Sequence, residues 1–298
     1  MHTRPVKQTG RDAHFVMKIL GISRDPKYSP NATDRDAAIF QATASRLARH
    51  HHVSLISEEF FISVDLEEFD AVFSMARSHS VLTALAEAES TMGLQVFNAA
   101  HALLAATRVK QAEVFQEKGV PQPAFAVCQS LDASLPALPF PFWLKRSDAC
   151  AQHTGDVRFI GDEQAWAEAV TDFSARAVSE ALALEHVQGD VVKFYGVEGT
   201  SFFYASVVSA TTGYSKFGLE RHNGDPHHYA YNAEALQQAA NVAARALGLT
   251  IYGGDAIVSP DGHFYIIDFN DWPSFAACRK EAAKAIAERI ESAFLVVR

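Results

Sequence analysis

Near the end of the sequence lie three oxygen-bearing side chains, Asp255, Asp268 and Asn270. Asp268 and Asn270 are two residues apart in an apolar segment of strand type, so both face the same side. A Pro-Asp-Gly turn at 260–262 predicts a hairpin that places Asp255 on the partner strand. Magnesium prefers hard oxygen ligands and usually takes its remaining ligands from water and phosphate. The pattern predicts a magnesium site, and a solvated strand end entering a loop is the alternative.

Two lysines in predicted strands supply positive charge. Lys145 ends the apolar segment 142–145 and precedes a polar loop at 147–156. A fixed ammonium group followed by a covering loop suits nucleotide phosphates, which need a point charge and the exclusion of water. Lys193 lies among apolar neighbours at 191–196, where a charge needs a partner such as a phosphate. The alternatives are a snorkelling strand-end lysine at 145 and a strand with one exposed face around Lys193.

The N-terminal third alternates strand and helix patterns, which predicts a parallel sheet with crossover helices. The expected strands are 15–22, 53–56, 70–74 and 94–97, and the expected helices are 33–49 and 81–92. Residues 1–13 are polar, lack the apolar centre of a signal peptide and predict a flexible tail. We therefore expect an N-terminal α/β domain at 14–100.

The remainder predicts antiparallel strands mixed with helices. The expected helices are 101–118, 162–173, 234–247 and 276–292, and the expected strands are 124–128, 142–145, 157–160, 182–187, 191–196, 202–209, 251–258 and 264–269. We expect a central subdomain at 101–186 and a C-terminal subdomain at 187–298 that carries the metal site. The fold class is then α/β, with α+β character in the C-terminal part.

Composition limits the partners. The chain has 298 residues, 48% of them apolar, and a formal net charge of −9. This charge argues against nucleic acid, which requires a basic surface. No apolar run is long enough to span a membrane, so no membrane partner is expected. Three separated cysteines without paired spacing fit a reducing compartment, and we expect a cytoplasmic protein. The sequence does not predict the oligomeric state.

Taken together, these segments resemble the ATP-grasp superfamily. The family pattern is a phosphate-binding lysine before a flexible loop, a hinge that brackets adenine, and an acid followed by an acid-x-asparagine pair. Lys145, the hinge Glu185-His186-Val187, and Asp255 with Asp268 and Asn270 follow this order. The resemblance spans roughly residues 15–275. It implies an N-terminal parallel α/β domain followed by a two-subdomain ATP-grasp fold that binds ATP and Mg²⁺.

Two branches of that superfamily are similar to different parts of the chain. Residues 94–125 resemble the carboxylate–amine ligases that include the ribosomal-protein glutamate ligases, with Arg108 in the place of a second phosphate-binding lysine and Lys110 as the alternative. The segment Asp268-x-Asn270-x-x-Pro-Ser-Phe resembles the inositol trisphosphate 5/6-kinases, as does Lys193. The same branch implies a phosphate contact for His153, although the loop 147–156 holds a single glycine where the family often has several.

The resemblance implies transfer of the γ-phosphate of ATP, with Lys145, Lys193 and Arg108 as the catalytic cations. In the ligase reading a substrate carboxylate accepts the phosphate and an amine then captures the acyl phosphate. The alternatives are a kinase that phosphorylates a hydroxyl and a nucleotide-binding module without catalysis. We expect a small-molecule or peptide substrate.

Four arginines are candidate substrate anchors, because the guanidinium fork suits carboxylates and phosphates; each is also compatible with a solvated surface position. They are Arg24, Arg77, Arg158 and Arg221. Arg24 and Arg77 follow the first and third predicted strands, at the carboxyl edge where open α/β sheets bind ligands.

Overall fold

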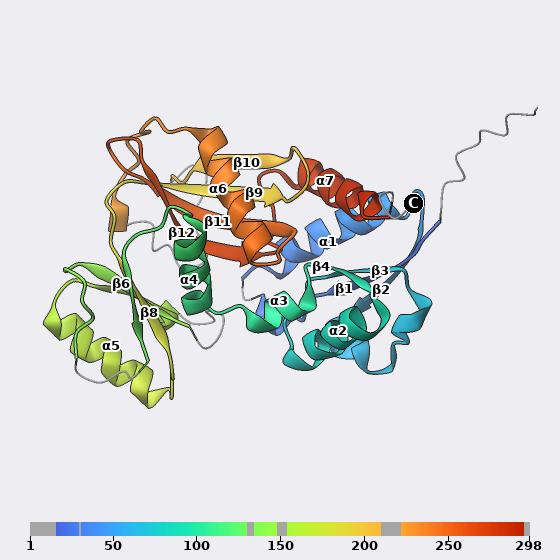
Figure 1. Cartoon of the computed structure of the whole chain (residues 1–298), viewed down its shortest axis with the longest axis horizontal. Helices are drawn as coiled ribbons and strands as arrows, with labels where there is room; N and C mark the ends of the chain where they lie inside the picture. The colour runs from blue at the N-terminus through green and yellow to red at the C-terminus, as the bar shows by residue number, and fades with distance from the viewer. Residues whose placement is uncertain (1–15, 30, 130–133, 148–153, 210–221, 295–298) are drawn as a thin grey trace, which may run out of the picture.

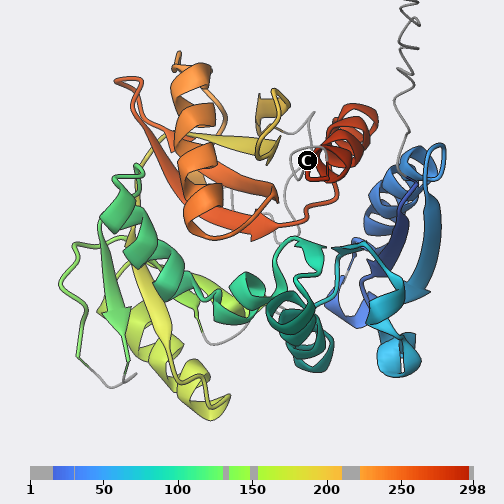
Figure 2. The same ribbon diagram turned by 45° about the vertical axis from the view of Figure 1, so that its right-hand side comes forward.

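The computed structural model describes residues 16–29, 31–129, 134–147, 154–209 and 222–294. It contains three four-stranded sheets, which Figures 1 and 2 show as three separate layers with helices packed on them. The expected tail at 1–13 lies outside the described residues. Within the described part, no helix is long and apolar enough to cross a membrane.

The N-terminal sheet is parallel, as predicted, with the order β2-β1-β3-β4. Its strands are β1 (Lys18–Ser23), β2 (His52–Ser57), β3 (Ala71–Ser74) and β4 (Gln95–Phe97). Helix α1 (Thr33–Leu47) packs on the face that carries Ile19 and Phe73, and α2 (His79–Met92) packs on the face that carries Leu20 and Val72. Both faces are covered, which explains the continuous apolar pattern of β1.

Three short 3₁₀ helices follow the strands of this sheet and were not predicted. They are η1 (Pro26–Tyr28), η2 (Glu58–Ser63) and η3 (Leu66–Glu68). Asp25 and Asp65 accept hydrogen bonds from backbone N–H groups two residues later and so begin η1 and η3. Local side-chain caps of this kind replace the strand or helix periodicity on which sequence predictions depend.

The single long helix predicted at 101–118 is wrong. The structure has two helices, α3 (Ala100–Ala105) and α4 (Arg108–Lys118), separated by two extended residues. Thr107 caps the second helix, because its Oγ1 accepts a hydrogen bond from the Lys110 N–H at 3.1 Å. A threonine in this position favours a new helix start over helix continuation. The break places Arg108 in the first turn of α4.

The central sheet is antiparallel, with the order β5-β8-β6-β7. Its strands are β5 (Phe125–Cys128), β6 (Phe142–Arg146), β7 (Val157–Ile160) and β8 (Ala181–Glu185). Helix α5 (Glu163–Ala175), capped by Asp162, covers the face that carries Phe142 and Leu144. The opposite face carries Lys145 and Leu184.

The C-terminal sheet is also antiparallel, with the order β10-β9-β11-β12. Its strands are β9 (Asp190–Val197), β10 (Phe203–Val207), β11 (Ile251–Val258) and β12 (Phe264–Asp271). Helix α6 (Ala233–Ala246) packs on Phe194, Tyr252 and Phe269. By alternation, Lys193 and Asp268 face the other side.

One apolar core joins the N-terminal sheet to the end of the chain. Helix α7 (Arg279–Ser292) lies beside α1, and their buried residues share a cluster with β1 and β3. Trp272 is fully buried there, and its ring stacks on Phe73 with centroids 6.1 Å apart. The N-terminal domain is thus packed directly on the segment that follows β12, whereas the central sheet lies at the other end of the molecule (Figure 1).

Candidate functional site

The predicted metal ligands lie in one cross-strand row. Asp255 on β11 is opposite Asp268 on β12, and Lys193 on β9 is opposite Asp255. The Lys193 Nζ lies 3.1 Å from Asp255 Oδ1, and the Asn270 amide donates to Asp268 Oδ2 at 2.9 Å. Because directly opposite residues share a face of a sheet, the row presents two carboxylates, an amide and an ammonium group to the same side.

This set of donors fits a magnesium ion that shares its coordination with a phosphate ligand. The described part of the chain has no cluster of three His, Cys, Asp or Glu side chains suited to a metal. The row therefore offers two carboxylates, Asp255 and Asp268, with the Asn270 oxygen as the third donor. Mg²⁺ is usually bound by one or two carboxylates together with water and substrate phosphates rather than by a complete protein cage.

Lys145 reaches this row from the central sheet. Its side chain is 7% exposed, and its Nζ donates to the Ile267 carbonyl at 2.6 Å. The register of β11 and β12 shifts here, because Asp255 pairs with Asp268 while Ala256 pairs with Ile266. Ile267 is therefore the extra residue of a β-bulge. Burial lowers the pKa of Lys145, while the nearby Asp268 raises it.

Asp268 is held in its charged form by the surrounding cations. Burial raises the pKa of this carboxyl, but Lys145, Arg108, the hydrogen bond from Asn270 and Lys193 together leave the pKa below its ordinary value. Arg108 Nη1 donates to the Arg146 carbonyl at 2.7 Å, and its buried Nε has no hydrogen-bond partner among the described residues. Two cations thus converge from α4 and β6 on a half-buried carboxylate, which suits the binding of a polyanion with its counter-ion.

A pocket opens beside these charges, between α4, the central sheet and β12. It is lined by Arg108, Gln111, Ala112, Phe115, Gln122, Lys145, Leu182, Leu184 and the segment 266–269. Arg108, Lys145 and Asp268 supply the charged groups of this lining, and leucine, isoleucine and phenylalanine supply most of its apolar side chains. Apolar walls with a few convergent polar groups are typical of small-molecule sites, and a nucleotide has the matching division into a flat base and phosphates.

The predicted hinge follows β8 and is fixed by side chains from both subdomains. His186 Nδ1 accepts a hydrogen bond from Trp143 Nε1 at 3.1 Å, and burial lowers the pKa of His186. The Val187 carbonyl accepts from Asn223 Nδ2 at 3.1 Å. Glu185 is the last residue of β8, and its N–H donates to the Ala124 carbonyl at 2.8 Å. The hinge backbone is therefore held at the end of the pocket walls that contain Leu184.

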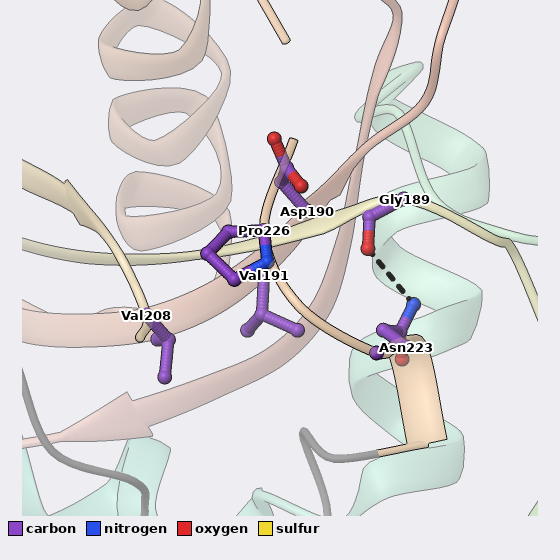
Figure 3. A pocket seen from close by; sticks show the side chains of 7 residues that line it. Gly189, Asp190, Val191, Val208, Asn223 and Pro226 are labelled. Carbon is purple, nitrogen blue, oxygen red and sulfur yellow. Dashed lines mark hydrogen bonds between the residues drawn. The ribbon is translucent and has the colours of Figure 1, made fainter. Parts of the chain in front are cut away.

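A second, smaller pocket lies behind the hinge and is lined by 189–191, Val208, 223–224 and Pro226 (Figure 3). Figure 3 shows Asn223 bonded to the Gly189 carbonyl, a distance of 3.1 Å. The buried carboxylate of Asp190 accepts from the backbone N–H groups of His227 and Tyr229, each at 2.7 Å. These bonds satisfy Asp190, so the pocket is a packing feature of the loop before α6.

The candidate substrate arginines lie in different surroundings. Arg24 and Arg77 lie at the carboxyl edge of the N-terminal sheet, and both approach Asp271, at 4.0 and 2.6 Å. Arg158 lies opposite Leu144 in the β6–β7 register, so it faces α5 and lies 3.5 Å from Asp172. The structure therefore does not bring Arg158 to the face that carries Lys145. Arg221 and His153 lie outside the described residues.

Several site residues were not predicted from the sequence. They are Trp143 at the hinge, Gln111, Phe115 and Gln122 in the pocket, and Asp271 beside the arginines. Trp143 had a usable signal, because it lies two residues before Lys145 on one strand and so shares its face. Gln111 and Phe115 on α4 had no such signal, because the prediction of one continuous helix gave the wrong orientation for its second half.

The same arrangement of sheets occurs in solved structures. Neither a protein-family model nor a curated protein sequence matches this chain. A D-alanine–D-alanine ligase from Bacillus anthracis, in complex with ATP, matches at a TM-score of 0.64 and 12% identity, over 94% of this chain and 99% of that one. D-alanyl-alanine synthetase A from Vibrio cholerae matches at 0.66 and 10% identity, over 94% and 99%. A RimK domain ATP-grasp protein from Sphaerobacter thermophilus matches at 0.61 and 16% identity, over 91% and 98%.

The chain has the ATP-grasp fold. The expected fold class, a parallel N-terminal α/β domain followed by the two ATP-grasp subdomains, is thus confirmed. Within this fold, the strand of Lys145 and the row of Lys193, Asp255 and Asp268 belong to different sheets, and both Lys145 and Asp268 line the pocket.

Proposed function

We propose that this chain is a magnesium-dependent ATP-grasp enzyme that transfers the γ-phosphate of ATP to a substrate carboxylate, after which an amine captures the acyl phosphate. One observation carries the proposal. Lys145 and Arg108, from separate elements, lie close to Asp268 in the row with Asp255 and Lys193, and Lys145, Arg108 and Asp268 line a pocket that is otherwise largely apolar. This arrangement supports the binding of a nucleotide triphosphate with its divalent ion.

In this proposal the base lies between Leu184 and Ile267, against the hinge, and the phosphates extend toward β12. Lys145 and Arg108 neutralise the inner phosphates. Asp255, Asp268 and Asn270 would hold Mg²⁺, which supplies neutralisation of charge on the phosphate oxygens. Lys193, one strand further from β12 than Asp255, would lie toward the γ-phosphate and the acceptor.

The reaction balances without a covalent bond to the protein. A carboxylate oxygen of the substrate bonds to the γ-phosphorus while the bond to the bridging oxygen of ADP breaks. The amine then attacks the acyl carbon, the phosphate leaves, and the nitrogen gives up a proton. Catalysis consists of positioning and charge stabilisation by Lys145, Arg108 and Lys193.

Two considerations favour a carboxylate acceptor. A carboxylate is already ionised at neutral pH, so the transfer needs no general base. The solved structures of similar fold include proteins named D-alanine–D-alanine ligase and one named a RimK domain ATP-grasp protein. The kinase alternative is favoured by the Asp268-x-Asn270 pair beside Lys193. A small molecule or a short peptide is the expected substrate in either case.

The test measures ADP release from MgATP with amino acids, short peptides and inositol phosphates, each with and without hydroxylamine. Hydroxylamine traps an acyl phosphate as a hydroxamate, so hydroxamate formation supports a carboxylate acceptor. ADP release with a polyol phosphate and no hydroxamate would replace the ligase with the kinase. Calorimetry of ATP binding completes the test, because an ATP affinity that Lys145→Ala leaves unchanged would contradict the proposed site.

A further inference from the structure

Arg24 directly follows β1, and its side chain, only 9% exposed, contacts three separate segments. Its Nη1 lies 2.9 Å from Asp36 Oδ2 on α1, and its Nε donates to the Met75 carbonyl after β3 at 3.1 Å. Its Nη2 donates to the Trp272 carbonyl at 3.3 Å and lies 4.0 Å from Asp271 Oδ2. The guanidinium group therefore joins the N-terminal domain to the end of β12.

The segment that Arg24 holds comes directly after the candidate metal ligand Asn270. Asp271 is also held by Arg77 Nη2 at 2.6 Å, and the Arg77 N–H in turn donates to Glu58 Oε2 at 2.7 Å. The carboxyl edge of the N-terminal sheet thus contacts the two residues after Asn270 through two arginines. Three elements of that domain supply these contacts.

Trp272 needs such support, because its backbone has a φ of +34°. A bulky residue at positive φ is strained and persists only where its surroundings fix it. The Trp272 ring stacks on Phe73, the backbone N–H of Trp272 donates to the Ile251 carbonyl at 3.1 Å, and the Trp272 carbonyl accepts from Arg24. The direction in which β12 ends therefore depends on the N-terminal domain.

We propose that Arg24 is a positioning residue that fixes the end of β12 so that Asn270 faces the metal ion, and that the N-terminal domain thereby completes the metal site. This inference rests on the proposed function. It differs from the sequence-based expectation that Arg24 contacts substrate, because its polar atoms are engaged by protein groups. Residues that orient metal ligands typically change metal affinity 10- to 100-fold when substituted.

The experiment measures ADP binding by calorimetry, with and without Mg²⁺, on the full chain. In the wild type the ratio of the two dissociation constants reports the contribution of the metal ion. We expect Arg24→Lys, which keeps the charge but loses the fork, to reduce that ratio about 10-fold and to leave ADP binding without Mg²⁺ unchanged. Asn270→Ala should lower the same ratio of dissociation constants until little effect of Mg²⁺ remains.

A double-mutant cycle separates positioning from general loosening. If Arg24 acts through Asn270, Arg24→Lys has little further effect on the ratio in an Asn270→Ala background. Ile286→Ala is the matched control, since Ile286 is fully buried in the core between α1 and α7. It should lower the melting temperature and leave the Mg²⁺ ratio unchanged.

Several results would overturn the inference. A purely structural residue would cause equal losses of ADP affinity with and without Mg²⁺, and that result in Arg24→Lys would overturn it. Additive effects of Arg24→Lys and Asn270→Ala on the ratio would also overturn it. An unchanged ratio in Arg24→Lys would also exclude it, while the proposed function would stand. By contrast, a wild-type chain that binds no ADP, or binds it without any effect of Mg²⁺, would show that the proposed function itself is wrong.

Discussion

The C-terminal sheet has two neighbours, and its two junctions differ in kind. Toward the N-terminal domain the junction is filled: Phe73 and Trp272 stack, and Asn98 binds three backbone groups of Thr250 and Ile251 at 2.6 to 2.7 Å. Toward the central sheet it contains a pocket and the buried Lys145. The filled junction gives a fixed frame, and the hollow junction holds the charges that suit a ligand.

The largest expected effect lies at the hollow junction. Asp268→Asn removes the carboxylate that faces Lys145 and Arg108, so turnover should fall at least ~1000-fold, which corresponds to about 4 kcal/mol of transition-state stabilisation. ADP release with an active acceptor measures this. Glu288→Gln, an exposed carboxylate change on α7, is the control and should leave the rate unchanged. Retained activity in Asp268→Asn would remove Asp268 from the metal site.

Phe40→Ala tests the filled junction. Phe40 is 2% exposed and lies 5.1 Å from the Phe73 ring. Its truncation should lower the free energy of unfolding by about 3–4 kcal/mol through lost burial and a new cavity. Denaturant unfolding measures this loss. ATP affinity of the folded variant should stay within about twofold, and a large loss of affinity at low denaturant would show that the two junctions are coupled.

Leu184→Ala is the matching change at the hollow junction. Leu184 is 3% exposed and lines the pocket. Because one wall of its site is already open, we expect a smaller loss of stability, about 2 kcal/mol. Here ATP binding should weaken about 10-fold, as followed by calorimetry. A stability loss as large as that of Phe40→Ala, without an effect on ATP, would mean that both junctions are ordinary core.

The smallest effect concerns Glu58, which lies beside Arg77. Its side chain is 4% exposed, and Oε1 has no hydrogen-bond partner among the described residues. Burial raises the pKa of Glu58, so the folded chain binds this proton more tightly than the unfolded chain. Stability contributed by the protonated form is therefore lost as the pH rises from about 4.3 through the raised pKa.

Glu58→Gln should flatten this dependence. One proton can change the free energy of unfolding by at most about 1.4 kcal/mol per pH unit. The melting temperatures of the two proteins should therefore diverge only modestly across this range. The variant should be relatively more stable at the upper end. Parallel curves for the two proteins would contradict a raised pKa at Glu58.

The sequence predicted the parts of this site that follow from alternation. Asp268 and Asn270 share a face because they are two residues apart, and the turn at 260–262 brings Asp255 opposite. The face of Arg158 was not predictable, because it depends on how β6 and β7 pair across the long loop between them. Thr107 was hidden in an apparently continuous helical period, and its capping bond interrupts that period.

The contacts of Arg24 were beyond any sequence pattern. Its partners are 12, 51 and 248 residues away along the chain, and two of them are backbone carbonyls. Such a carbonyl carries no information about residue type. The position of Arg24 at the carboxyl edge of the sheet was predictable from the order of strands. Its protein partners were not, because they depend on how the segment around Trp272 packs on the N-terminal domain.

The bulge at Ile267 allows an apolar side chain and a charged side chain to follow one another directly on the same face of β12. In a regular strand, consecutive side chains point to opposite faces, but the extra residue lets Ile267 pack in the apolar clusters of the cleft while Asp268 joins Asp255 in the row next to it. An apolar contact and an ionic contact are therefore made by two consecutive residues of β12. Because Ile266 and Phe269 on either side both face α6, deleting one residue here would restore strict alternation and leave only one of the two side chains on the cleft face.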